Sequence, residues 1–188
     1  TTWPSDHWKI GGGSVWGWVS YDPELDLLYH GTGNPGPWNP DVRPGDNKWT
    51  CAILARDADT GELRWVLQVT PHDLWDYDTP SQPALYDLGR DGLTLPALAQ
   101  PTKMGHLFLL NRTTGEPLFP IEERAVPVDG VPGETLAPTQ PVPTHPPPLH
   151  PMSFGPDDAW GFTFWDRGRC RDQIAALRSE GMYTPPTL

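Results

Sequence analysis

Residues 55–65 read ARDADTGELRW, and residues 109–119 read LLNRTTGEPLF. The two stretches match position for position at a constant offset of 54 residues, in three pairs: Asp57 with Asn111, Thr60–Gly61 with Thr114–Gly115, and Trp65 with Phe119. A repeat at a period of about 50 residues is typical of stacked or radial architectures. Each copy predicts a strand, a Thr-Gly turn and a second strand that ends in an aromatic residue. Hairpins at this spacing indicate blades of a β-propeller, in which roughly four to eight blades close a ring.

Further strand candidates flank the repeat and complete the expected blades. Residues 21–33 predict a strand end, a turn at Pro23–Glu24 and a return strand, and other strands are expected at 51–57, 63–69, 82–87 and 95–100. In GGGSVWGW, residues 11–18, Trp16 and Trp18 are expected to lie in a strand, where one belongs to the core and the other lines a cavity, although the core is the ordinary place for both. This material makes about three blades, too few to close a large ring. We therefore expect an internal fragment of a longer propeller.

The composition changes after residue 119. Residues 120–151 are rich in proline and predict an extended loop without a core. Cys170, Ile174 and Leu177 recur at helical spacing and predict a short helix at about Asp166–Glu180, followed by Gly181 as a stop. We therefore divide the chain into residues 1–119, propeller blades that carry part of a site, and residues 120–188, a Pro-rich insertion and short helical segment of the same domain.

The length, net charge and composition of the chain limit which partners it can have. The chain has 188 residues, a net charge of −11 and no basic run, which argues against nucleic acid and anionic membranes as partners. The 25 Pro and 19 Gly suggest many tight turns, while 10 Trp argue against disorder. No apolar run is long enough to cross a bilayer. Cys51 and Cys170 allow a single bridge or two buried thiols, of which we favour the thiols.

Residues 72–78, HDLWDYD, concentrate acidic side chains. Repulsion among Asp73, Asp76 and Asp78 has to be offset by a cation, by hydrogen bonds or by bulk water, and a solvated acidic turn is an ordinary alternative. We expect Asp73 to be structural and hydrogen-bonded to backbone, and His72 to orient its neighbours rather than bind a metal. Asn34, in GTGNP, can turn its side-chain oxygen onto a cation or onto its own backbone, and the second use is commoner.

Several motifs in this order resemble those of the quinoprotein dehydrogenases. They are WKIGGGSVWGW (8–18), YDPELDLLYHGTGNPGPWNP (21–40), RPGDNKWT (43–50) and TPHDLWDYD (70–78). The first half resembles the methanol and ethanol dehydrogenase branch. The second half, with LAPTQPVPTHPPP (136–148) and AWGFTFWDRGRCRDQIAALRSEGMYTPP (159–186), resembles the glucose, quinate and shikimate branch. The resemblance implies an all-β fold, a fragment of an eight-bladed β-propeller with tryptophan-type blade motifs, a Pro-rich loop and one short helix.

The resemblance also implies a role for particular residues. Trp16 matches the indole beneath the quinone ring of pyrroloquinoline quinone (PQQ), Ser14 a hydroxyl residue that hydrogen-bonds the cofactor, and Lys103 a basic residue beside the quinone oxygens. Asn34 and Asp78 match ligands of the active-site cation, and Asp76 matches the catalytic base and a further ligand. Oxygen ligands suit calcium or a lanthanide and do not suit zinc. Asp78 does not decide between the two cations.

The implied chemistry needs these residue types. A hydroxyl is a weak acid, so a positioned base such as Asp76 has to take its proton while hydride moves from carbon to the quinone. The cation and Lys103 then stabilise the charge on the quinone oxygen. The expected enzyme is a periplasmic oxidoreductase that acts on an alcohol, polyol or sugar and passes electrons to cytochrome c or ubiquinone. Any membrane association is expected only through parts outside these residues.

The sequence is expected to hold only part of the site, and it also allows two other interpretations of the function. The family's glutamate ligand and its adjacent-cysteine pair are expected before Thr1 and the later blades after Leu188, so these residues are expected to hold only part of a site and to bind the cofactor weakly or not at all alone. A non-catalytic propeller module for protein binding or assembly is the alternative of another class. A sugar-binding surface of exposed indoles is weaker, because Trp65 and Trp75 fall at strand-end positions typical of packing.

Overall fold

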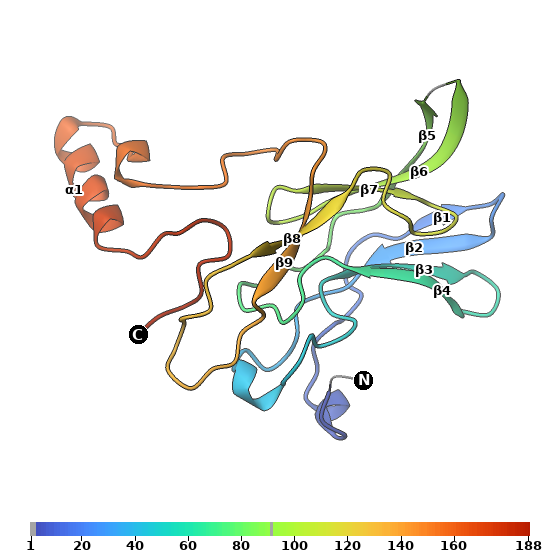
Figure 1. The fold of residues 1–188 in the computed structure, drawn as a ribbon, viewed down its shortest axis with the longest axis horizontal. Coiled ribbons are helices and arrows are strands. Elements are labelled where there is room, and N and C mark those ends of the chain that lie inside the picture. The colour runs from blue at the N-terminus through green and yellow to red at the C-terminus, as the bar shows by residue number, and fades with distance from the viewer. Residues whose placement is uncertain (1–2, 91) are drawn as a thin grey trace.

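A four-stranded antiparallel sheet forms the first blade of the computed structural model (Figure 1). The strands are β1 (Ser20–Asp22), β2 (Leu27–Gly31), β3 (Ala52–Asp57) and β4 (Leu63–Gln68), and they neighbour one another in chain order. The structure describes residues 3–90 and 92–188; Thr1, Thr2 and Asp91 lie outside the described residues. The strands expected at 51–57 and 63–69 and the hairpin expected within 21–33 are confirmed.

A three-stranded antiparallel sheet follows as the second blade and lies beside the first (Figure 1). It contains β5 (Ala84–Arg90), β6 (Leu93–Pro101) and β7 (Leu107–Asn111), which confirms the strands expected at 82–87 and 95–100. After β7 the chain turns back and is joined to it only by an isolated bridge, Leu110 with Pro117. The final strand that the second repeat predicts is therefore reduced to a short extended segment.

The two repeat turns have the same geometry. In each, the glycine N–H donates to the carbonyl that starts the turn: Gly61 to Asp57 at 2.9 Å, and Gly115 to Asn111 at 2.8 Å. Both glycines have positive φ, 73° and 77°, a conformation that glycine adopts without a steric penalty. The repeat read from the sequence is thus a structural repeat.

Arg112 joins the two blades. Its Nε donates to Asp22 Oδ2 of β1 at 2.6 Å, and its Nη1 donates to the carbonyl of Tyr86 at 2.7 Å and to Asp87 Oδ1 at 2.8 Å, both in β5. Its own carbonyl accepts from Trp65 Nε1 at 3.0 Å. The core that the two sheets share is apolar and aromatic, with fully buried side chains at Tyr29, Ile53, Leu98, Phe108 and Leu110.

The Pro-rich segment departs from its prediction. Residues 120–151 contain a two-stranded ribbon of β8 (Ile121–Ala125) and β9 (Thr139–Pro143), and its Gln140 and Val142 are buried. The expectation of an extended loop without a core was therefore wrong. Each strand of a two-stranded ribbon has one unpaired edge, which tolerates a proline that lacks an N–H.

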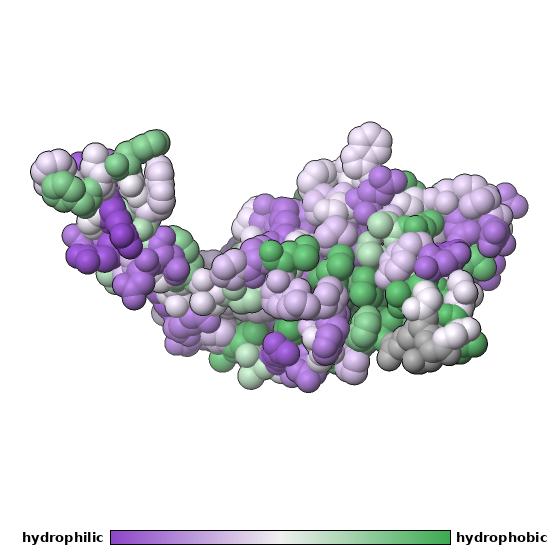
Figure 2. All heavy atoms as spheres, turned by 90° about the horizontal axis from the view of Figure 1, so that it is seen from above, coloured by the Kyte–Doolittle hydropathy of each residue, from purple (hydrophilic) through white to green (hydrophobic). Residues whose placement is uncertain are grey.

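The C-terminal helix, α1, is shorter than predicted and lies apart from the sheets (Figure 1). It runs from Phe164 to Ala175, not from Asp166 to Glu180. Its start is set by Thr163, whose side chain accepts from the N–H of Asp166 at 3.2 Å. Figure 2 shows this part as an arm that projects from the body. Among the described residues, three short 3₁₀ helices span His7–Lys9, Pro40–Val42 and Pro156–Asp158.

The side chains of α1 are mostly exposed. Ile174 is buried, whereas Leu177 lies beyond the end of α1 and is 69% exposed, so only part of the expected apolar face forms and is covered. Cys170 is half-buried and Cys51 is buried, and both thiols are free, as favoured from the sequence. None of the helices among the described residues has the length and apolar character needed to span a bilayer.

Candidate functional site

The glycine-rich segment 11–18 is extended but forms no regular strand beyond an isolated bridge of Gly12 with Pro35. Trp16 and Trp18 are 59% and 75% exposed, so neither belongs to the core, and the exposure of Trp16 agrees with the place beneath a cofactor ring that the resemblance implies. The cause is the close approach of the main chain, because a β-carbon on Gly12 or Gly17 would overlap neighbouring backbone. The backbone thus faces the protein body, and both indoles face outward.

Gly33 is the point where three distant segments meet. Its N–H donates to the carbonyl of Ser14 at 2.8 Å. A β-carbon on Gly33 would lie 2.9 Å from Asp78 Oδ1 and 3.2 Å from Trp16 Nε1. Only glycine fits here without a shift of these groups, and its small size lets the Trp16 indole and the Asp78 carboxylate approach the same place.

Asn34 lies next to this point and is half-buried. Its backbone N–H donates to Asp78 Oδ1 at 2.7 Å, and its Nδ2 donates to the carbonyl of Pro35 at 3.2 Å. Within residues 3–90 and 92–188, Oδ1 of Asn34 accepts no hydrogen bond, so the expected local backbone use of this oxygen is not observed. The amide oxygen is therefore the group of this side chain that remains for a ligand.

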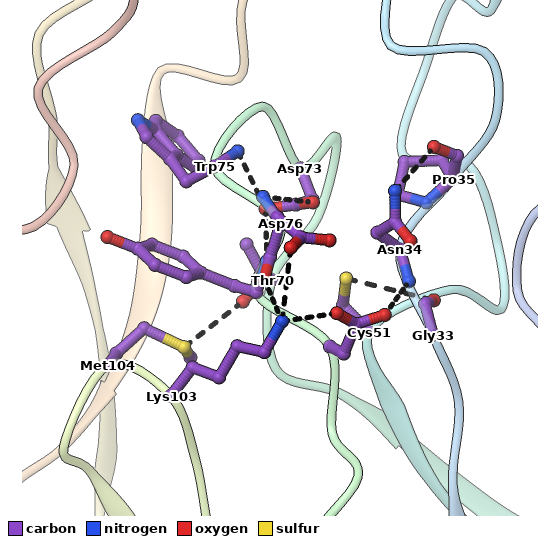
Figure 3. A network of polar contacts seen from close by, with 12 residues as sticks. Gly33, Asn34, Pro35, Cys51, Thr70, Asp73, Trp75, Asp76, Lys103 and Met104 are labelled. Atoms are coloured by element: carbon purple, nitrogen blue, oxygen red, sulfur yellow. Dashed lines mark hydrogen bonds and ion pairs between the residues drawn. The ribbon is translucent and has the colours of Figure 1, made fainter. Parts of the chain in front are cut away.

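Lys103 connects the carboxylates of Asp76 and Asp78, and Figure 3 shows its contact with Asp76. Its Nζ donates to the carbonyl oxygen of Asp76 at 2.7 Å, lies 3.3 Å from Asp76 Oδ2, and contacts Asp78 Oδ2 directly. Burial alone would raise the pKa of Asp78, but Lys103 and the N–H of Asn34 outweigh it and lower that pKa. Burial opposes the charge on Lys103 as well, and the two carboxylates raise the pKa of Lys103 above its ordinary value.

Asp73 holds the backbone of Asp76. Its buried carboxylate accepts the N–H groups of Trp75, Asp76 and Tyr77, each at 3.1 Å, which confirms the predicted structural role. Asp76 itself has a φ of 66°, a left-handed conformation that costs a residue other than glycine about 1–3 kcal/mol. The three hydrogen bonds offset that cost and fix where the Asp76 carboxylate points.

The other predicted neighbours have packing roles. His72 is buried with Nδ1 2.7 Å from the carbonyl oxygen of Gly45, so its ring contacts the 43–47 loop. Trp75 stacks on Tyr77, with 5.6 Å between ring centroids, and its Nε1 donates to the carbonyl of Thr184 at 2.7 Å. The prediction that Trp65 and Trp75 pack, rather than form an exposed sugar-binding surface, is confirmed, since Trp65 is buried and Trp75 packs against the core.

Two residues at the site were missed from the sequence. Gly33 is the second glycine of the GTGNP motif. A glycine in such a loop indicates that another group can approach the backbone closely. Arg43 opens the motif RPGDNKWT and is 1% exposed, although arginine is rarely buried to that degree. No local pattern indicates the burial of Arg43, because the groups that cover it come from separate loops.

The donor set fits part of a site for a hard cation. Asp76 and Asp78 supply carboxylate oxygens and Asn34 an amide oxygen, the ligand types that calcium and lanthanides prefer. Among the described residues, no group of three or more His, Cys, Asp or Glu could hold a metal ion. A calcium ion takes roughly six to eight oxygens, so further ligands have to come from a cofactor or from other parts of the protein. The exposed face of Trp16 is apolar and flat, which fits an aromatic cofactor ring.

Comparisons with known proteins agree with this chemistry. Residues 1–188 match the family described as PQQ glucose/ethanol/alcohol dehydrogenase, β-propeller domain. The chain is 51% identical over 127 residues to a lanthanide-dependent methanol dehydrogenase of Methylorubrum extorquens, a match that covers 68% of this chain and 21% of that protein. It is 41% identical over 176 residues to a quinoprotein glucose dehydrogenase of Gluconobacter oxydans, covering 91% of this chain and 22% of that protein.

A solved structure shows the same fold. A europium-containing methanol dehydrogenase matches with a TM-score of 0.60 and 43% sequence identity, over 76% of this chain and 24% of that chain. This chain therefore spans about a quarter or less of the relatives that it matches. The resemblance stated from the motifs is confirmed, with PQQ as the family's cofactor and a lanthanide named for several relatives. The chain belongs to the PQQ-dependent glucose, ethanol and alcohol dehydrogenase family and is part of its β-propeller domain.

Proposed function

We propose that the full-length protein oxidises a hydroxyl group of an alcohol, polyol or sugar with PQQ bound beside a calcium or lanthanide ion. The observation that carries this proposal is the approach of the Trp16 indole and the Asp78 carboxylate to Gly33. The backbone N–H of the neighbouring Asn34 binds Asp78, and Lys103 joins Asp78 to Asp76. A module that served only as a scaffold would not need these groups in one place.

Each residue has a separate task in this proposal. Asp76 takes the proton of the substrate hydroxyl, since its side chain is 44% exposed and its backbone is fixed by Asp73. Trp16 fixes the plane of the cofactor ring and excludes water from one side. Asn34 and Asp78 hold the cation, and Lys103 adds positive charge beside them. When bound, PQQ accepts hydride and the cation acts as a Lewis acid.

The wider setting is also part of the proposal. An eight-bladed ring, a periplasmic location and transfer of electrons to cytochrome c or ubiquinone are proposed from the family resemblance. Some relatives are named for cytochrome c, as in the methanol dehydrogenase [cytochrome c] subunit 1 of Methylobacterium organophilum. The substrate is proposed only as a class, since relatives are named for methanol, for glucose and for quinate or shikimate.

The proposal is tested with the full-length protein reconstituted with PQQ and either calcium or a lanthanide. Reduction of an artificial dye is followed with ethanol, glucose and quinate as substrates, and bound cofactor is followed by its absorbance. We expect bound PQQ and turnover with at least one substrate class. Absence of both would favour a binding or assembly module instead.

A further inference from the structure

Arg43 ties together the two loops that carry the candidate ligands. Its Nε donates to the carbonyl of Pro37, in the loop of Asn34, at 2.7 Å. Its Nη2 donates to the carbonyl of Asp73, in the loop of Asp76, also at 2.7 Å. One buried side chain therefore holds both loops by their backbones and fixes how far apart they lie.

The guanidinium has neutral oxygen acceptors in place of a carboxylate partner. Within residues 3–90 and 92–188, Arg43 forms no ion pair, and its Nη1 donates to Asn47 Oδ1 at 2.7 Å. Asn47 Nδ2 donates back to the carbonyl of Arg43 at 2.7 Å, and Asn47 is itself fully buried. A buried charge is costly unless its donors are paired, and the planar fork of arginine pairs them only in one fixed arrangement. Arg43 and Asn47, with the carbonyls that they bind, therefore form a rigid connection between the two loops, which we call the Arg43 brace.

The brace continues directly into the candidate site. Asp73, whose carbonyl accepts from Arg43, uses its carboxylate to accept the N–H of Asp76. On the other side of the site, the N–H of Asn34 donates to Asp78 Oδ1. A movement of Arg43 would therefore shift the Asp76 loop relative to the Asn34 loop, and the oxygen atoms of both loops would move with it.

We propose that Arg43 is a positioning residue that sets the separation between Asn34 and the Asp76 loop, and thereby the affinity of the site for a hard cation with oxygen ligands. This inference rests on the proposed function. Arg43 itself donates to none of the candidate ligand side chains. Lysine keeps the positive charge but carries a single ammonium, which cannot reproduce a fork that reaches both loops.

The test measures cation binding directly in the full-length protein. Terbium(III) emission, sensitised by nearby indoles, is titrated in the presence of PQQ for the wild type and for Arg43→Lys, and calcium is then used as a competitor. We expect Arg43→Lys to lower the affinity for both ions by about 10- to 100-fold, the usual effect of residues that orient metal ligands. We also expect kcat at saturating substrate to fall more than KM rises.

Arg112→Lys is the matched control. Arg112 is also a largely buried arginine, with a side chain 11% exposed, and it also binds backbone and carboxylate oxygens from two segments. Both variants should lose thermal stability, but only Arg43→Lys should lose cation affinity. Asn47→Gly is a milder second variant for the case that Arg43→Lys does not fold. Glycine tolerates the φ of 54° at position 47, and the change removes the acceptor of Arg43.

The outcomes separate the inference from the function on which it rests. Weaker terbium binding in folded Arg43→Lys, or in Asn47→Gly, with unchanged binding in Arg112→Lys supports the inference. Unchanged terbium affinity in a folded variant of the brace overturns it while the proposed function stands. A wild-type protein that binds neither ion and oxidises none of the substrates removes the proposed function itself.

Discussion

The indole of Trp65 lies against Gly115, so that a β-carbon on Gly115 would be 2.6 Å from the ring. Trp65 ends the first copy of the repeat and Gly115 belongs to the turn of the second copy. The indole Nε1 also donates to the carbonyl of Arg112, three residues before Gly115 in the chain. The aromatic residue that ends one copy of the repeat therefore packs directly on the turn of the next copy.

Gly115→Ala is predicted to destabilise the protein more than Gly61→Ala. Both glycines have similar positive φ, so both alanines incur the left-handed penalty of about 1–2 kcal/mol. A β-carbon on Gly61 meets no atom within 4 Å, whereas one on Gly115 meets Trp65. We expect an additional loss of about 1–3 kcal/mol for Gly115→Ala, measured as the difference between the two variants in thermal or urea unfolding. Equal losses would mean that the indole moves aside at no cost.

Asp22→Asn is predicted to weaken the junction of the blades above about pH 4. Burial alone would raise the pKa of Asp22, but Arg112 and the N–H groups of Glu24 and Leu25 outweigh it and lower that pKa. Because the folded pKa lies below the unfolded value of about 3.9, the carboxylate contributes fully above that value, and the contribution disappears as the pH falls through the folded pKa.

The variant should therefore lose about 1.5–3 kcal/mol of stability at pH 7, the usual range for a hydrogen bond to a charged group. Melting temperatures of both proteins at pH 7, 5, 4 and 3 would measure this loss. The difference in melting temperature between the wild type and Asp22→Asn should become smaller at the lowest pH. A gap that stays constant with pH would assign the loss to packing instead of charge.

Asp76→Asn is predicted to remove turnover while PQQ remains bound. The amide cannot take a proton from the substrate, so the rate should fall by about 10²- to 10⁴-fold. The backbone contact of Lys103 with the carbonyl of Asp76 does not involve the changed atoms. Dye reduction at saturating cation reports the rate, and cofactor absorbance reports binding. A variant with wild-type rates would exclude Asp76 as the base.

Asp78→Asn is predicted to reduce lanthanide affinity more than calcium affinity. The Coulomb attraction of a carboxylate is proportional to the charge of the ion, so a trivalent ion loses more when that charge is removed. Asparagine keeps an oxygen that can accept the N–H of Asn34, which limits the structural change. Competition between terbium and calcium in the two proteins would measure the change in selectivity. An unchanged ratio of affinities would place Asp78 outside the coordination of the ion.

Gly33→Ala is predicted to weaken PQQ and cation binding together. The added methyl group would press on Asp78 Oδ1 and the Trp16 indole, at 2.9 and 3.2 Å. Gly89→Ala is the matched control, because a β-carbon on Gly89 meets nothing within 4 Å and the residue is exposed in β5. Titration of PQQ absorbance and of terbium emission would follow both ligands. Equal affinities in the two variants would show that the site tolerates the methyl group.

The features that could be predicted from sequence are those with local causes. The repeat turns depend on Gly61 and Gly115 at positive φ, and the strands around them on alternating apolar residues, so both were found in the chain pattern. The candidate site residues were named from motif resemblance. The structure places Trp16, Asp78 and the Ser14 carbonyl beside Gly33, and the backbone N–H of Asn34 on Asp78. Lys103 joins Asp78 to Asp76.

The features that could not be predicted depend on distant contacts. The close packing of the backbone of segment 11–18 at Gly12 and Gly17 depends on residues of other loops. The β8–β9 ribbon depends on pairing across residues 126–138, and its prolines hid the strand pattern. The burial of Arg43 follows from acceptors at Pro37 and Asp73, which lie on two separate loops. In each case the residues in contact are far apart in the chain, so no short stretch of sequence contains all of them.

The Arg112 junction has a consequence for the whole ring. In a closed propeller, the rotations between successive blades have to add to one full turn. Here Arg112 helps to set the rotation between the first two sheets, because its side chain binds Asp22 on β1 and Asp87 on β5. If the rotation between these two blades changed, the rotations between the other blades would have to change in compensation. Contacts between neighbouring blades, such as those of Arg112, therefore determine the curvature of the ring.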